Sequence, residues 1–109
     1  MNEHELYFEV DKLISPYIRE LKYVYQRYGN DRIKLAVVCD ELSVKIQNFI
    51  RKLFKVDYKE FNSSYVYSSF VDALMEYAYL NAEDEFLETL NKFSGNVARF
   101  ILEENFDTY

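Results

Sequence analysis

The stretch VCDELSVKIQNFIRKLFK, residues 38–55, is compatible with two different folds. In a helix-turn-helix, the chain would turn at Glu41-Leu42-Ser43, and Ser43 would begin a recognition helix over residues 43–55. In a helical bundle, the whole stretch would belong to one unbroken helix that packs along its apolar side. The first fold predicts a DNA-binding protein, and the second predicts a protein that acts through some other surface.

The spacing of the apolar residues favours the unbroken helix. At about 100° per residue, these residues stay within an arc of about 120° over roughly six turns. They are Leu35, Val38, Cys39, Leu42, Ile46, Phe49, Ile50, Leu53 and Val56. A helix-turn-helix would reset this phase, and the turn that it requires contains neither Gly nor Pro. We therefore predict one helix from about Asp31 to Val56.

The opposite side of this helix carries a second, shorter apolar stripe. It consists of Ile33, Val37 and Val44. A helix in the middle of a bundle packs on both sides, and such packing would bury these three residues. A self-association or partner surface would instead leave them exposed. We favour burial inside the bundle.

The composition of the whole chain predicts an all-α fold. Only two Gly and one Pro occur in 109 residues, which leaves few of the residues that hairpins and tight turns require. Apolar residues make up 50% of the chain, enough for one core. We predict that residues 1–109 form a single domain, a compact bundle of four to five helices.

The first predicted helix begins at Asn2 and ends before Gly29. Asn2 and Glu5 resemble a capping box, and Gly29 is free to adopt a left-handed conformation after the last turn. Pro16 removes one backbone hydrogen bond in the middle of the segment. Ser15 and Pro16 could also start a separate helix. Because the apolar stripe keeps its phase across Pro16, we predict one helix that is kinked there.

The second half of the chain is expected to form two further helices and a short last one. Ser63 or Ser64 would cap the third helix. Its predicted apolar face consists of Val66, Phe70, Ala73, Tyr77 and Leu80. Asn81 would cap the fourth helix. The segment SGN, residues 94–96, would interrupt that helix, and residues 97–106 would form the last one.

Charge is distributed unevenly along the chain. Residues 32–59 contain seven basic and three acidic side chains, whereas residues 60–109 contain two basic and ten acidic ones. The simplest structural explanation is that the acidic fourth helix lies antiparallel against the basic second helix, in exposed ion pairs. Alternatively, one of the two charged surfaces binds another molecule.

The two charged surfaces predict different partners. An acidic patch would attract a basic surface on another protein. We assign this patch to Glu83, Asp84, Glu85 and Glu88. A DNA-binding helix would use basic and amide side chains on phosphates and base edges. These would be Lys45, Gln47, Asn48, Arg51 and Lys52. Because DNA-binding domains are usually strongly basic and this chain has a net charge of −6, a nucleic-acid partner is less favoured.

The residues that catalysis requires are scarce. The single histidine, His4, is expected in the first turn of the first helix, so no histidine pair can hold a metal. Cys39 belongs to the apolar stripe, which indicates a buried thiol and not a nucleophile. We therefore predict no catalytic residue, no metal site and no cofactor. A lone cysteine suits a reducing compartment, and no apolar run approaches the roughly 18 residues that span a membrane.

Taken together, these patterns favour a cytoplasmic, non-enzymatic protein without a membrane partner. Its predicted role is to cover the surface of another protein through an acidic, aromatic-rich helical surface, as an inhibitor, an antitoxin-like factor or an assembly subunit. Eleven Tyr and nine Phe also suit an interface, which allows a homodimer. The alternative is a helix-turn-helix DNA-binding regulator that uses residues 43–55.

Overall fold

The computed structural model describes residues 2–54 and 63–103, which contain helices and no strand. The described helices are α1 (Glu3–Tyr28), α2 (Arg32–Phe54), α3 (Ser63–Phe70), α4 (Asp72–Tyr79), α5 (Glu83–Asn91) and α6 (Phe93–Glu103). The all-α fold class is thus confirmed. The predicted number of four to five helices is wrong, because the described ranges contain six.

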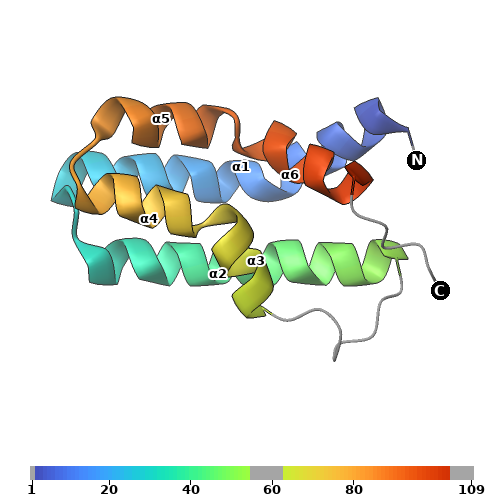
Figure 1. Cartoon of the computed structure of the whole chain (residues 1–109), viewed down its shortest axis with the longest axis horizontal. Coiled ribbons are helices and arrows are strands. Elements are labelled where there is room, and N and C mark those ends of the chain that lie inside the picture. Colours follow the sequence, from blue (N-terminus) through green and yellow to red (C-terminus); the bar gives the residue numbers. More distant parts are fainter. Residues whose placement is uncertain (1, 55–62, 104–109) are drawn as a thin grey trace.

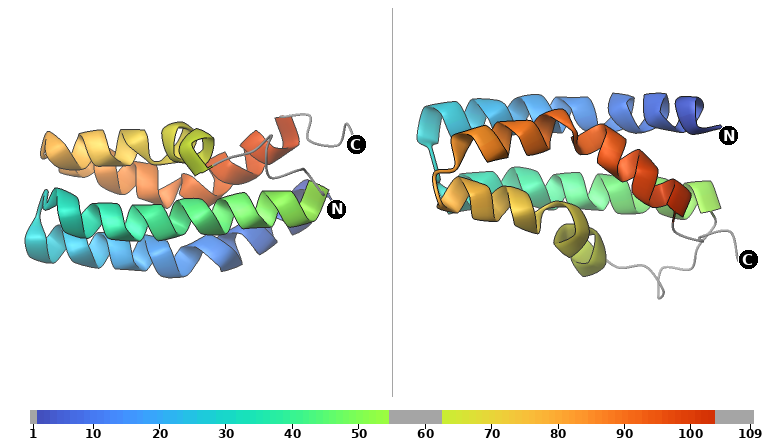
Figure 2. Two further views of the ribbon diagram at one scale, coloured as in Figure 1. Left: turned by 90° about the horizontal axis from the view of Figure 1, so that it is seen from below. Right: turned by 45° about the horizontal axis from the view of Figure 1, so that its top comes forward.

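Two long helices form one side of the molecule, and four short helices cover them. α1 packs against α2 and α6, and α2 packs mainly against α1, α3 and α4. α5 packs against α4 and α6. The connections between α1 and α2 and between α4 and α5 lie at the same end of the molecule (Figure 1). Figure 2 shows α1 and α2 side by side in the view from below.

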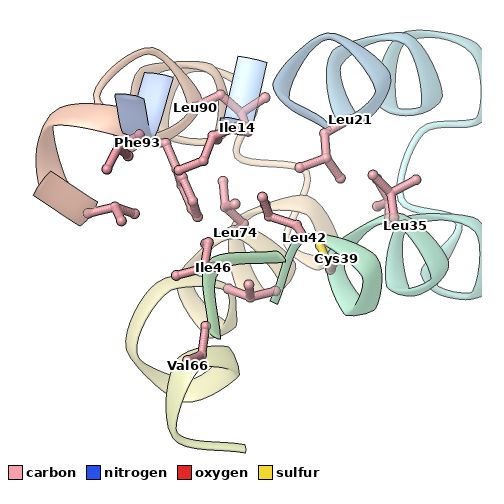
Figure 3. Close-up of a cluster of buried hydrophobic side chains, with 14 of the residues drawn as sticks. Ile14, Leu21, Leu35, Cys39, Leu42, Ile46, Val66, Leu74, Leu90 and Phe93 are labelled. Carbon is pink, nitrogen blue, oxygen red and sulfur yellow. The ribbon is translucent and has the colours of Figure 1, made fainter. Parts of the chain in front are cut away.

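One continuous cluster of apolar side chains forms the core between these helices. Figure 3 shows side chains from the different helices pointing toward one another in this cluster. The fully buried members with the largest side chains are Phe86, Ile14, Leu21, Leu35, Leu42, Ile46, Ile50, Leu74, Leu90 and Ile101. Burial of so many large side chains is the main force that holds the short helices on the long ones.

The predicted apolar stripe of α2 faces this core. Leu35, Val38, Cys39, Leu42, Ile46 and Ile50 are buried. Phe49 and Leu53 are partly buried against the core, and Val56 lies outside the described residues. α2 is continuous through residues 41–43, so a helix-turn-helix with its turn there is not formed. Ser43 does not cap a helix: its hydroxyl donates to the Cys39 carbonyl oxygen at 2.9 Å, one turn earlier in α2.

The ends of α1 follow the sequence prediction. The Glu5 backbone N–H donates to the Asn2 side-chain oxygen at 2.8 Å, and the Asn2 amide donates to the Glu5 carboxylate at 3.2 Å. At the other end, Gly29 has the expected positive φ of 63°, which a residue without Cβ adopts at little cost, but its ψ of −132° lies outside the left-handed helical region. α1 continues through Pro16 as one helix. The predicted kink there stays a prediction.

The third predicted helix is divided into α3 and α4 at Val71. The predicted apolar face is wrong in part, because Ala73 and Leu80 are exposed while Val71 is fully buried. The residues of this region that enter the core are Val66, Val71, Leu74 and Ala78. A step of five residues separates the first two of them, so the buried residues of α3 and α4 do not follow one narrow stripe.

The boundaries of α5 also differ from the prediction. Asn81 has a φ of 56° and follows α4, so it does not cap the next helix. The Asn81 N–H donates to Ala78 O at 3.1 Å, and the Ala82 N–H donates to Tyr77 O at 2.8 Å. This pair of bonds is a Schellman motif, which ends α4 with an asparagine in the position that glycine usually takes. The N-cap of α5 is Ala82.

The predicted interruption at residues 94–96 is wrong. These residues lie in the first turn of α6, and the break falls earlier, at Lys92. The buried residues of α5 and α6 explain why residues 94–96 stay helical, because most of them follow steps of three and four across the segment. They are Phe86, Leu90, Phe93, Val97 and Ile101. The predicted last helix, residues 97–106, is described as far as Glu103.

Candidate functional site

The predicted acidic patch lies at the start of α5. Glu83, Asp84 and Glu85 form its first turn, and Glu88 follows one turn later. All four side chains are exposed, because Phe86 and Leu90 occupy the side of the helix that faces the core. Carboxylates in the first turn are favoured there by the positive end of the helix dipole.

The structure brings Glu85 and Glu88 together. With Tyr77 of α4 they line a shallow hollow of about 280 Å³, which Thr89, Lys92 and Asn96 complete. The hollow thus combines two carboxylates with the half-buried ring of a tyrosine. A lysine or arginine side chain from another molecule fits such a site, because its aliphatic stem can pack on the ring while its charge meets the carboxylates.

One of these two carboxylates, that of Glu88, already forms an ion pair with Lys92. Its ammonium lies 2.7 Å from the Glu88 carboxylate, one helical turn away, and both side chains are largely exposed. The hydrogen bond from Lys92 and its positive charge lower the pKa of Glu88. Ion pairs between exposed side chains contribute little to stability, so another cation can replace Lys92 at small cost.

Glu83 lies on a different side of the helix from this hollow. It lies close enough to Tyr25 of α1 for its charge to act on that residue, and the Tyr25 ring stacks on Phe86 with the ring centroids 4.4 Å apart. Burial raises the pKa of the Tyr25 hydroxyl, and the negative charge of Glu83 raises this pKa further. The four predicted residues therefore do not form one site: Glu85 and Glu88 line the hollow, Glu83 lies near α1, and Asp84 is exposed in the first turn without lining the hollow.

The expected pairing of the acidic helix with the basic one is wrong. The main neighbours of α2 are α1, α3 and α4, whereas α5 packs against α4 and α6. The ion pair that Glu88 forms is with Lys92, and not with a basic residue of α2. The charge asymmetry along the sequence is therefore not explained by direct contact between the two helices.

The residues of the DNA-binding alternative do not share one surface. Lys45, Asn48 and Lys52 are exposed on α2 in steps of three and four. Gln47 is only 4% exposed, and Arg51 is half-buried. A side chain as buried as Gln47 cannot reach a base edge unless α2 leaves its place, so direct readout by this set is not supported.

Cys39 is sealed in the core. Its sulfur lies 3.7 Å from that of Met75, and its side chain has no exposed surface. Burial, with a smaller effect from the charge of Asp40, raises the pKa of Cys39 to about 12. The thiol is thus protonated at neutral pH and is not a nucleophile. His4 is exposed in the first turn of α1.

Neither a metal site nor a membrane span is found in the described parts of the chain. No group of three or more His, Cys, Asp or Glu side chains in residues 2–54 and 63–103 is arranged to hold a metal ion. Over the same ranges, every helix is too short or too polar to cross a membrane.

Cation–ring contacts join helices at the end that holds the two short connections (Figure 1). The Arg32 guanidinium lies 3.6 Å from the centroid of the Tyr79 ring, and the Lys34 ammonium lies 4.7 Å from that of Tyr28. The Asn30 amide also donates to the Tyr79 carbonyl at 3.4 Å. The sequence did not reveal the two contacts with Tyr79, because residues far apart in the chain meet only after folding.

The second apolar stripe of α2 is not buried, contrary to the prediction. Ile33 is 79% exposed, Val37 56% and Val44 45%. The neighbours of α2 cover its other sides and leave this one open. A single isoleucine or valine on a surface is ordinary, but three of them on one side of one helix form an apolar surface that requires an explanation.

No protein-family model, no curated protein sequence and no solved structure matches this chain. The shape and chemistry of its surfaces are therefore the basis for proposing what it does.

Proposed function

We propose that this chain is a non-enzymatic, cytosolic binding protein that covers a basic surface of another protein, as an inhibitor, an antitoxin-like factor or an assembly subunit. The observation that carries the proposal is the hollow between α4, α5 and α6. Glu85 and Glu88 stand at this hollow beside the ring of Tyr77. It offers a basic side chain both an apolar wall and negative charge.

Binding at this hollow is an exchange of cations. Lys92 holds Glu88 in the free protein, at 2.7 Å. A lysine or arginine of the partner takes the place of Lys92, which moves into solvent. Asp84 and Glu83 are exposed in the same first turn, Glu83 on the side near α1, and their negative charge speeds the encounter with a basic partner.

A non-enzymatic role agrees with the positions of the reactive side chains. The thiol of Cys39 is buried and protonated, and it lies against Met75. The only histidine of the chain, His4, is exposed at the start of α1. Surface occlusion requires no reactive group, and its energy comes from area, shape and charge. A buried thiol is also compatible with a cytosolic location, where cysteines stay reduced.

The test is affinity capture from the native host with the protein immobilised at low density. The wild-type chain is compared with a variant in which Glu83, Asp84, Glu85 and Glu88 are all replaced by Lys. We expect a specific partner with a basic surface, and roughly a hundredfold weaker binding of that partner by the variant at low salt. Affinity is then measured on the purified pair.

A matched control removes the same amount of negative charge elsewhere. It carries the reversals Glu9→Lys, Glu20→Lys, Asp72→Lys and Glu76→Lys, all at exposed positions of α1 and α4. Asp72 is in the first turn of its helix, as Glu83, Asp84 and Glu85 are, so the control reproduces part of the loss of favourable helix-dipole interaction. Equal weakening by the two variants would contradict the acidic patch as the binding site.

DNA binding through α2 is the second candidate. The observation in its favour is that Lys45, Asn48 and Lys52 are exposed on one side of the helix. Such a surface could contact phosphates without reading bases. Fluorescence anisotropy with mixed-sequence DNA at low salt decides the question, because even non-specific binders associate at tens of micromolar, on the order of 10⁻⁵ M. We expect no binding at that concentration.

A further inference from the structure

The exposed apolar stripe of α2 is not required by the fold of one chain. Ile33, Val37 and Val44 lie on one side of the helix and span about 16 Å along it. Branched side chains such as these form helices less readily than Ala, Leu or Lys. In Figure 1, α2 is at the lower edge of the molecule along the half that carries the stripe. Neither helix propensity nor packing within the chain therefore accounts for these residues.

On one flank of the stripe, the charges alternate in sign along the helix. Lys34, Glu41 and Lys45 are exposed and follow one another along one flank, in steps of seven and four. Lys34 is held over the ring of Tyr28, with its ammonium 4.7 Å from the ring centroid, so this flank lies on the side of α1. An alternating row of this kind can pair with a reversed copy of itself.

We propose that this side of α2 is the contact between two copies of the chain, with the two α2 helices antiparallel and a two-fold axis close to Val37. In an antiparallel two-fold pair, each flank meets the same flank of the other copy. Val37 then packs on Val37 of the second copy, Ile33 lies next to Val44, and Glu41 lies beside Lys34. In a parallel two-fold pair, this flank would instead meet the opposite flank of the other copy, so Lys34 and Glu41 would not be neighbours across the contact.

The contact is small, so the dimer is reversible. Three aliphatic side chains from each copy bury much less than the roughly 800 Å² per partner of a stable interface. We therefore expect the dimer to dissociate on dilution. This inference does not rest on the proposed function, because the acidic patch is on α5, which does not take part in the contact.

Sedimentation velocity over a wide range of protein concentration tests the dimer. The average mass of the wild-type chain should rise from that of one chain toward twice that value. Val37→Asp places two like charges at the axis and should raise the dissociation constant at least about tenfold. Phe8→Asp is the matched control, because Phe8 is a large apolar residue of α1 that is 66% exposed. It should leave the dissociation constant unchanged.

Charge exchange tests the antiparallel arrangement. Lys34→Glu alone and Glu41→Lys alone should each weaken the dimer, because each places like charges side by side across the contact. The double variant with both substitutions should restore it, since the pair is only reversed. All four proteins should keep the same helical circular dichroism, because both positions are exposed.

Disulfide formation tests the position of the axis. In a Cys39→Ala background, Val37→Cys should form a linked dimer under mild oxidation, because the two introduced thiols face each other at the axis. Phe8→Cys in the same background should not. Three results would each overturn the proposal: a one-chain mass at every concentration, a dimer that Val37→Asp leaves unchanged, or a double charge variant as weak as the single ones.

Discussion

Two opposite sides of α2 both carry aliphatic residues, but one side is buried in the core and the other is exposed. Leu42 and Ile46 are buried in the core, whereas Val37 and Val44, on the opposite side of the same helix, are exposed. Periodicity detects both stripes equally well, because it depends only on spacing. The difference shows that an apolar stripe indicates which residues can be buried together, while the number of neighbouring helices decides whether they are.

The largest effect is expected on the buried side. Leu42→Ala removes a fully buried side chain and leaves a cavity between α2 and its neighbours. We expect the free energy of unfolding to fall by about 3 kcal/mol or more. Urea denaturation followed by circular dichroism measures this change. A loss below about 1 kcal/mol would mean that the core around Leu42 is far looser than the structure indicates.

Thiol reactivity compares the two sides directly. Cys39 should react with a thiol reagent on the order of a hundred times more slowly than an exposed cysteine, because reaction requires the helix to open. The exposed reference is Val44→Cys in a Cys39→Ala background, at low protein concentration. Since the pKa of Cys39 is raised to about 12, its reaction should stay slow as pH rises through 8 and 9. Equal rates for the two thiols would contradict the assignment of the two sides.

A smaller effect is expected on the exposed side. Val44→Ala removes apolar surface that solvent already reaches, and alanine favours the helix. At low protein concentration, the free energy of unfolding should change by less than about 0.5 kcal/mol in either direction. The measurement is the one used for Leu42→Ala, so that the two substitutions are compared under identical conditions. A loss as large as that of Leu42→Ala would show that this side is covered.

The smallest effect concerns the acidic patch. Lys92→Gln removes the hydrogen bond and the charge that lower the pKa of Glu88, so this pKa should return toward its usual value. The lowered pKa means that the pair favours the folded state at neutral pH and that this contribution disappears as pH falls through the pKa of Glu88. A carboxylate-resolved NMR titration of both proteins measures the shift. An unchanged pKa of Glu88 would show that Glu88 and Lys92 do not form the ion pair in solution.

Local features were well predicted from the sequence. The stripe from Leu35 to Ile50 is buried as expected, and Asn2 caps α1 through Glu5. Gly29 has the positive φ that was expected after the last turn. Each of these features depends on residues within a few positions of one another, whose spacing or side-chain chemistry is visible in the chain.

Features that depend on distant residues were not predicted. Asn81 looked like an N-cap, but it ends α4 in a left-handed conformation, which asparagine tolerates as well. The helix is divided at Val71, and both Val66 before the division and Val71 itself are buried in the core. The hollow at Glu85 and Glu88 exists only because α4, α5 and α6 meet there. The spacing of residues along the chain does not show which helices will pack against one another.

The sequence by itself determined that this protein is all-α, where its two long helices lie, and which stripe of α2 enters the core. Hydrogen bonds within a helix and the period of its apolar residues are local properties, so they can be read from the chain. Only the tertiary structure decided that α5 packs away from α2 and that Ile33, Val37 and Val44 are exposed. Those outcomes depend on which helices fill the limited space around one another.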